Sequence, residues 1–184
     1  VSGETAAGGI IGSVNKSENL FDFNNFTKVP YTKWGTLSNI AIDKANKSIY
    51  YKYDKKTLFS STKGLSTNGD TTSANIKCYK VSVKPSTQYT VSFNASGTHA
   101  NTSYLRVSLV YWKNVTTRDS SSGKATPTLV NGTRYKYTFT TGSSVRYVSF
   151  QFQVEAPPAE GNVTFSKIAF HSGTNTATYA SGIY

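Results

Sequence analysis

Short runs of alternating hydrophobic and polar residues recur along this chain, and turn-forming residues separate them. In one run, Leu105, Val107 and Leu109 alternate with Arg106 and Ser108, which is the period of a strand with one face in a core. Runs of the same kind are "KSIYYKYD", "IKCYKVSV", "QYTVSFNASG", "RYKYTFTTG" and "VRYVSFQFQV". Because glycine or proline closes several of these runs, we predict separate half-buried strands joined by turns.

The last such run, "GNVTFSKIAFHSG", changes phase between Phe165 and Ile168, which predicts a β-bulge. Helical periodicity is confined to "LSNIAIDKAN" from Leu37, which we interpret as at most one helical turn. The predicted fold class is therefore all-β, a two-sheet jelly-roll β-sandwich of about 8–10 antiparallel strands. Its closure should bring the first strand, near Asn19 to Phe23, beside the last strand before His171. The polar segment 114–133 is predicted to be a long projecting loop.

Length and composition agree with one such domain. The chain has 184 residues, 14% of them aromatic, and contains no methionine. Residues 1–18 are rich in Gly, Ala and Ser and are predicted to form a flexible linker, so that the β-sandwich module spans 19–184. The start has no signal-peptide pattern, and no apolar run is long enough to span a membrane.

Charge and cysteine usage limit the chemistry. The 20 Lys and Arg residues exceed the 9 Asp and Glu residues, for a net charge of +11. Such an excess favours anionic partners such as nucleic acid, anionic lipid or acidic polysaccharide, although the even spread of the charge also fits an ordinary solvated surface. The single cysteine, Cys78, cannot form an internal disulfide, and together with His99 and His171 it makes no zinc-binding spacing. We predict no metal and no cofactor.

Enzyme motifs are absent from the sequence. The acidic residues fall mostly in linkers and turns, and no two lie together mid-strand as glycoside hydrolysis would require. There is no Gly-x-Ser-x-Gly nucleophile elbow and no Gly-rich phosphate loop. We therefore predict that the protein is not an enzyme.

Two predicted strands carry an unusual outer row. Opposite the core row of one strand stand Tyr104, Arg106, Ser108 and Trp112, and opposite the core row of the other stand Tyr147, Ser149, Gln151 and Gln153. If the two strands are neighbours, these residues form a polar floor with aromatic walls, which suits the C–H faces and hydroxyls of sugars. The predicted carbohydrate-binding residues are Trp112, Tyr104, Arg106, Tyr147, Gln151, Gln153 and, as a platform on a loop, Trp34.

Each of these residues also has a structural interpretation. Trp112 could close the edge of the sandwich, and a phase shift at Val110 would turn Tyr111 outward in its place. Trp34 could fill one end of the core. Rows of Tyr and Gln also occur on solvated sheets that bind nothing.

The order of four segments resembles the jelly-roll carbohydrate-binding modules of phage tail proteins. The segments are "VKPSTQYTVSFNASG", "LRVSLVYW", "GTRYKYTFTTGSSVRYVSFQFQV" and "GNVTFSKIAFHSGTNTATYASG", and an opening "NLFDF" also fits. The resemblance extends from about Asn19 to the C-terminus, and the order of the segments carries it rather than any single motif. One departure concerns the closing strand, where His171 and Ser172 stand before Gly173 at a place where such modules often have a carboxylate.

This resemblance implies a role in host recognition. Such modules are inserted in distal tail, fibre or baseplate proteins, and they attach the virion to cell-wall or capsular polysaccharide. For this chain we expect a location at the phage tail tip, a polysaccharide partner on a Gram-positive host, and contacts with other tail subunits through the parent protein. A structural calcium is common in the group, but only Asp22 and Asp43 could serve as early ligands in this acid-poor chain.

Two other functions remain open on the sequence. The module could be a structural spacer or assembly domain of a tail protein, without a ligand of its own. A nucleic-acid binder is suggested by charge alone, and no DNA- or RNA-binding signature is present. We predict neither a nucleic-acid partner nor a membrane partner.

Overall fold

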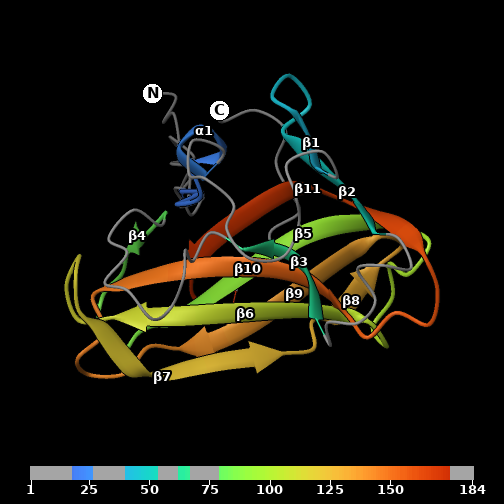
Figure 1. The fold of residues 1–184 in the computed structure, drawn as a ribbon. Helices are drawn as coiled ribbons and strands as arrows, with labels where there is room; N and C mark the ends of the chain where they lie inside the picture. The colour runs from blue at the N-terminus through green and yellow to red at the C-terminus, as the bar shows by residue number, and fades with distance from the viewer. Residues whose placement is uncertain (1–17, 27–39, 54–61, 67–78, 175–184) are drawn as a thin grey trace, which may run out of the picture.

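The computed structural model describes residues 18–26, 40–53, 62–66 and 79–174. In this part of the chain two antiparallel sheets pack face to face (Figure 1), and the all-β prediction is confirmed. Residues 1–17 of the predicted linker, Trp34 and Cys78 lie outside the described residues.

The first sheet, here called sheet A, has six strands and the second, sheet B, has five. In spatial order, sheet A contains β1 (Ile40–Asp43), β2 (Ser48–Tyr53), β11 (Gly161–Ser172), β5 (Gln88–Gly97), β9 (Arg134–Thr140) and β8 (Thr128–Asn131). Sheet B contains β3 (Thr62–Ser66), β10 (Tyr147–Glu155), β6 (Leu105–Trp112) and β7 (Arg118–Ala125), and the short β4 (Val81–Ser82) also pairs with β10.

The strand pairing is nested, as in a long hairpin that has been rolled up. From the outside inward, β2 pairs with β11, β3 with β10, β5 with β9, and β6 with β7. Successive strands of this hairpin alternate between the two sheets, which is the topology of a jelly roll. The predicted jelly-roll β-sandwich is thus the observed fold.

Aromatic side chains from both sheets meet in the core. Phe93, Phe150, Phe152, Phe165 and Phe170 are fully buried. Across the sandwich, the rings of Phe93 and Phe152 lie edge to face at 5.2 Å, and those of Phe150 and Phe170 at 5.0 Å. Each buried ring of this size stabilises the fold by about 1.5–3 kcal/mol, so these contacts hold the two sheets together.

Three tyrosines of the core keep their protons. Burial raises the pKa of Tyr53, Tyr79 and Tyr111 to about 12. The hydroxyls of two of them have partners, because Tyr79 Oη accepts a hydrogen bond from the Asp22 backbone N–H at 2.6 Å, and Tyr53 Oη lies 2.5 Å from His99 Nδ1.

The chain enters and leaves the sandwich at the same place. The Leu20 N–H donates to the Phe170 carbonyl at 2.8 Å, and Asn19 bonds to both Ile168 and Phe170. Asn19 and Leu20 therefore lie beside the last strand as predicted, but residues 19–23 do not form a strand, because residues 19–22 have no ladder of backbone pairs and Phe23 begins a helical turn. The next residues form the single turn α1 (Phe23–Phe26), whose N-terminus is capped by the Asp22 carboxylate.

The predicted bulge is confirmed, while two local predictions are wrong. The register of β11 against β5 shifts between Ser166 and Ala169, and Lys167 has a positive φ of 49°. Segment 114–133 is not a projecting loop, because it contains β7 and β8, edge strands whose backbone pairs with β6 and β9. Residues 40–43 form β1 in place of the helical turn, because they pair with β2. With these additions the described residues contain 11 strands, more than the predicted 8–10.

Candidate functional site

The two strands with the unusual outer rows are neighbours in sheet B. In the β6–β10 register, Trp112 lies opposite Tyr147, Ser108 opposite Gln151, and Arg106 opposite Gln153. The predicted adjacency is therefore confirmed. The outward-facing residues of these two strands, together called the outer face of sheet B, are Arg106, Ser108, Val110, Trp112, Tyr147, Ser149, Gln151, Gln153 and Glu155.

An indole occupies one end of this face. Trp112 and Val110 form a small buried cluster separate from the main core, and Tyr147 packs against it. Trp112 is 7% exposed, its Nε1 donates to Ser149 Oγ at 3.0 Å, and Lys80 Nζ lies 4.2 Å from the centroid of its ring. Trp112 thus faces outward as predicted, while Tyr111 packs against the main core, so the alternative with a phase shift at Val110 is wrong.

Two amides form the middle of the face. Gln153 Nε2 donates to Gln151 Oε1 at 2.5 Å. The side chains are deeply buried, with exposed fractions of 1% for Gln153 and 7% for Gln151. Gln153 Oε1 is a buried acceptor for which the described residues provide no hydrogen-bond donor. Such an atom costs free energy in the folded protein until a donor reaches it.

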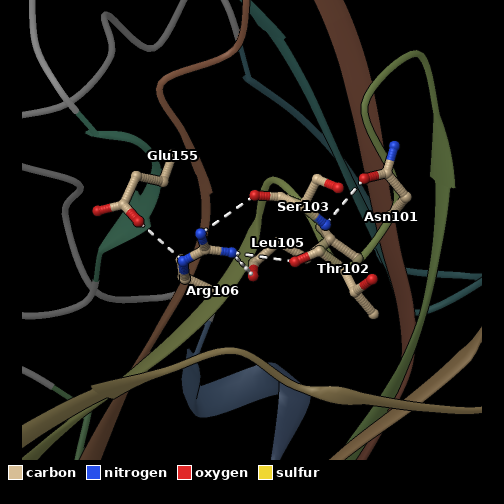
Figure 2. A network of polar contacts seen from close by, with 6 residues as sticks. All are labelled: Asn101, Thr102, Ser103, Leu105, Arg106 and Glu155. Carbon is tan, nitrogen blue, oxygen red and sulfur yellow. Dashed lines mark hydrogen bonds and ion pairs between the residues drawn. The ribbon is translucent and has the colours of Figure 1, made fainter.

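Arg106 and Glu155 form an ion pair at the other end (Figure 2). Arg106 Nε lies 2.8 Å from Glu155 Oε2, and both side chains are about one-fifth exposed, at 19% and 21%. The remaining guanidinium nitrogens donate to three backbone carbonyls at 2.8–3.2 Å, those of Thr102, Ser103 and Leu105. Arg106 therefore holds the turn before β6, and its guanidinium is directed to that turn.

Tyr104 does not join the outer row, and the prediction that it lies there is wrong. The turn from Asn101 to Leu105, closed by a hydrogen bond from the Leu105 N–H to the Asn101 carbonyl at 2.8 Å, ends the strand alternation before Tyr104. Its ring packs against the main core and lies edge to face with His99 at 5.1 Å. Trp34 lies outside the described residues, and its role as a platform stays a prediction.

The outer face of sheet A carries a second group of polar residues that the sequence analysis did not select. Arg134, on β9, extends over the neighbouring strand β5, where it donates to Asn94 Oδ1 at 3.2 Å and to Ser92 Oγ at 2.5 Å. It also reaches the Lys167 carbonyl, at the bulge of β11, at 2.5 Å. The signal in the sequence was the alternation of β9, which places Arg134 and Lys136 opposite the inward-facing Tyr135 and Tyr137.

The described residues contain neither a cluster of metal ligands nor a membrane-spanning helix. Within the described ranges, no group of three or more His, Cys, Asp or Glu residues is placed to hold a metal ion. The same residues include no helix with the length and hydropathy needed to cross a membrane.

Comparisons with known proteins give similar folds but no family. No protein family and no curated protein matches the sequence. A solved structure of accessory secretory proteins 1, 2 and 3 from Streptococcus pneumoniae is similar, with a TM-score of 0.50 and 8% identity, over 79% of this chain and 94% of that chain. At this identity the likeness shows the fold alone.

Two further similar structures have lower scores. A family 16 carbohydrate-binding module has a TM-score of 0.44 and 17% identity, over 76% of this chain and 89% of that chain. The enzymatically active domain of tailspike protein 4 from bacteriophage CBA120 has a TM-score of 0.42 and 10% identity, over 68% of this chain. This chain covers 15% of the length of that tailspike chain.

Proposed function

We propose that this protein is a non-catalytic carbohydrate-binding module of a phage tail or baseplate protein, and that it recognises host cell-wall polysaccharide and aids adsorption. The observation that carries the proposal is the composition of the outer face of sheet B, where an amide floor lies between an aromatic end and an ion pair. The jelly-roll topology and the order of segments that resembles phage tail modules support the same function.

The chemistry of the face matches a sugar ring. Tyr147 is only half-buried and offers a ring on which a sugar can stack. A sugar hydroxyl would supply the donor that Gln153 Oε1 lacks among the described residues. Because the floor is buried in the unbound protein, binding requires a local rearrangement, in which Lys80 leaves the face of Trp112.

The proposed location is the virion tail tip, with a Gram-positive host as the target. The net charge of +11 supports this choice, because it favours approach to an anionic wall. Other tail subunits would be reached through the parent protein. Several copies in one tail would allow a weak single site to suffice.

The experiment fuses the full chain to a fluorescent protein and measures labelling of Gram-positive cells. Tyr147→Ala and Gln153→Leu should each reduce labelling by about tenfold or more, because one removes the stacking ring and the other the acceptor. Leu129→Ser, at an exposed position of β8 in the other sheet, is the control and should label like the unmodified chain. Full labelling by both Tyr147→Ala and Gln153→Leu would exclude this face as the sugar site.

One observation favours a second function, a spacer or assembly domain without a ligand. The largest groups of the outer face already bind each other, since Trp112 bonds to Ser149 and Arg106 to Glu155. For that function, Trp112→Ala would disturb assembly of tail particles and leave adsorption of the assembled particles unchanged. Reduced adsorption by correctly assembled particles would instead favour the carbohydrate-binding module.

A further inference from the structure

The outer face of sheet A has a different character from the face that contains Trp112. Its outward positions carry short hydroxyl and amide side chains, among them Thr164, Ser166, Asn94 and Ser96. Tyr50, on β2, stands among them as an exposed ring with 38% of its surface accessible. Stacked sugars need such a ring, and their hydroxyls pair with side chains of this kind.

The strands of this sheet carry more positive than negative charge. They contain four basic residues, namely Lys52, Arg134, Lys136 and Lys167, against one carboxylate, Asp43. Asp43 lies in the edge strand β1, where its carboxylate accepts hydrogen bonds from Asn46 at 2.7 and 3.0 Å. Glu160 adds a second carboxylate at one end of the sheet, just before β11. The strands of sheet A therefore carry a net positive charge.

Arg134 fixes one of these charges over the centre of the sheet. Its guanidinium crosses β5 and ends at the bulge of β11, held by Asn94, Ser92 and the Lys167 carbonyl. A charge held in place by several acceptors loses little side-chain entropy when an anion approaches.

The register gives the dimensions of the face. Ser48, Ser166, Asn94 and Arg134 lie in one row across β2, β11, β5 and β9, and Tyr50 starts the next row, opposite Thr164. Three spacings between adjacent strands amount to about 14 Å. A polymer chain lying across the strands can thus reach the Tyr50 ring and the Arg134 guanidinium together.

We propose that the outer face of sheet A is a second binding surface, and that it takes a polysaccharide with repeated anionic groups. Lys52, Arg134 and Lys136 attract those groups, the hydroxyl and amide side chains bond to the sugar hydroxyls, and Tyr50 stacks on one ring. A nucleic acid fits less well, because single strands bind through several stacked aromatic rings, and Tyr50 is the one Phe, Tyr or Trp at an outward position of the described strands in this sheet.

The first experiment measures binding of the full chain to immobilised wall teichoic acid, a poly(ribitol phosphate) that carries N-acetylglucosamine rings, in 100 mM NaCl, with neutral dextran as the uncharged comparison. The double variant Lys52→Gln/Lys136→Gln should weaken binding by about fivefold, because exposed cations each contribute modestly. The matched control is Lys84→Gln/Lys113→Gln, which removes the same net charge from two exposed positions outside sheet A and should change binding by less than about twofold. Equal losses in both double variants would show that only net charge matters and would overturn the proposal.

A second set of measurements tests the sugar and the polymer class. Tyr50→Ser should also weaken binding, since the stacking ring is lost, and unchanged binding would overturn the assignment to a saccharide surface. Alginate, whose anionic groups are carboxylates, distinguishes a phosphate from a carboxylate preference. Single-stranded DNA that binds more tightly than both polymers and responds to the same lysine variants would reassign the face to nucleic acid.

The test is independent of the proposed function of sheet B. Tyr147 and Gln153 lie on sheet B. The variants Tyr147→Ala and Gln153→Leu should therefore bind teichoic acid like the unmodified chain. Loss of cell labelling in those variants with retained teichoic-acid binding would leave both surfaces in place. Teichoic-acid binding that disappears in Tyr147→Ala would place the polyanion on sheet B and overturn the second surface.

Discussion

The outer faces of the two sheets follow the same alternation and differ in how they meet solvent. On sheet B, the outward side chains bind each other, with Trp112 on Ser149 and Gln153 on Gln151, and these four residues are at most 7% exposed. On sheet A, Tyr50 and Lys52 are exposed, and short side chains surround them. The period of a strand thus tells which side a residue faces but not whether that residue meets solvent, since Thr90 and Ser92, at outward positions of β5 in sheet A, are only 0% and 6% exposed.

The largest expected effect tests this difference with one aromatic residue from each face. Trp112→Ala should lower the free energy of unfolding by about 3 kcal/mol, because it removes a buried indole and the hydrogen bond that the indole donates to Ser149. Tyr50→Ala should change it by less than about 0.5 kcal/mol, as expected for an exposed position. Urea denaturation measures both values. Similar losses in the two variants would contradict the contrast between the faces.

A smaller effect is expected at the ion pair of sheet B. Glu155→Gln should lower the free energy of unfolding by about 1 kcal/mol, since the Arg106 guanidinium keeps its carbonyl acceptors but loses its carboxylate. The loss should shrink in 1 M NaCl, where charges are screened within about 3 Å. Glu160→Gln, at an exposed position, is the control and should show little change. A loss that does not depend on salt would mean that the pair acts through packing alone.

The smallest effect concerns the cation above Trp112. Lys80→Gln should lower the free energy of unfolding by about 0.5 kcal/mol, the size of a partly exposed cation–π contact. Lys113→Gln, also a loss of one exposed lysine, provides the comparison in the same urea titrations. If both variants unfold at the same urea concentration, the Lys80 ammonium contributes nothing measurable to the outer face of sheet B.

The sequence predicted the fold well because the half-buried strands alternate clearly. The core rows of β5, β6, β9 and β10 and the bulge after Phe165 all lie where the alternation placed them. Prediction from alternation failed for β7, because its sequence "RDSSSGKA" has no hydrophobic period. Such an edge strand exists because its backbone pairs with β6, and a backbone hydrogen bond leaves no trace in side-chain pattern.

The candidate site was predicted only in part. The alternation placed Trp112, Tyr147, Gln151 and Gln153 on one outward face, and the register confirms it. It did not show that Arg106 would bind Glu155 and the preceding turn, because that contact joins residues 49 positions apart. The alternation also could not show the hydrogen bonds of Arg134. One of their acceptors is the Lys167 carbonyl, which lies at the bulge of β11 and comes close to Arg134 only in the assembled sheet.

The nested pairing has a mechanical consequence at the place where the chain enters and leaves the sandwich. Since residues 18–20 lie beside the end of β11, a pull that separates them loads the contact between Glu18 and His171 first and then the bonds of Asn19 and Leu20 to Ile168 and Phe170. These few bonds then break one after another. The aromatic core bears tension only once these bonds have broken. A brief pulling force therefore opens the contacts near Asn19 while the two sheets stay packed.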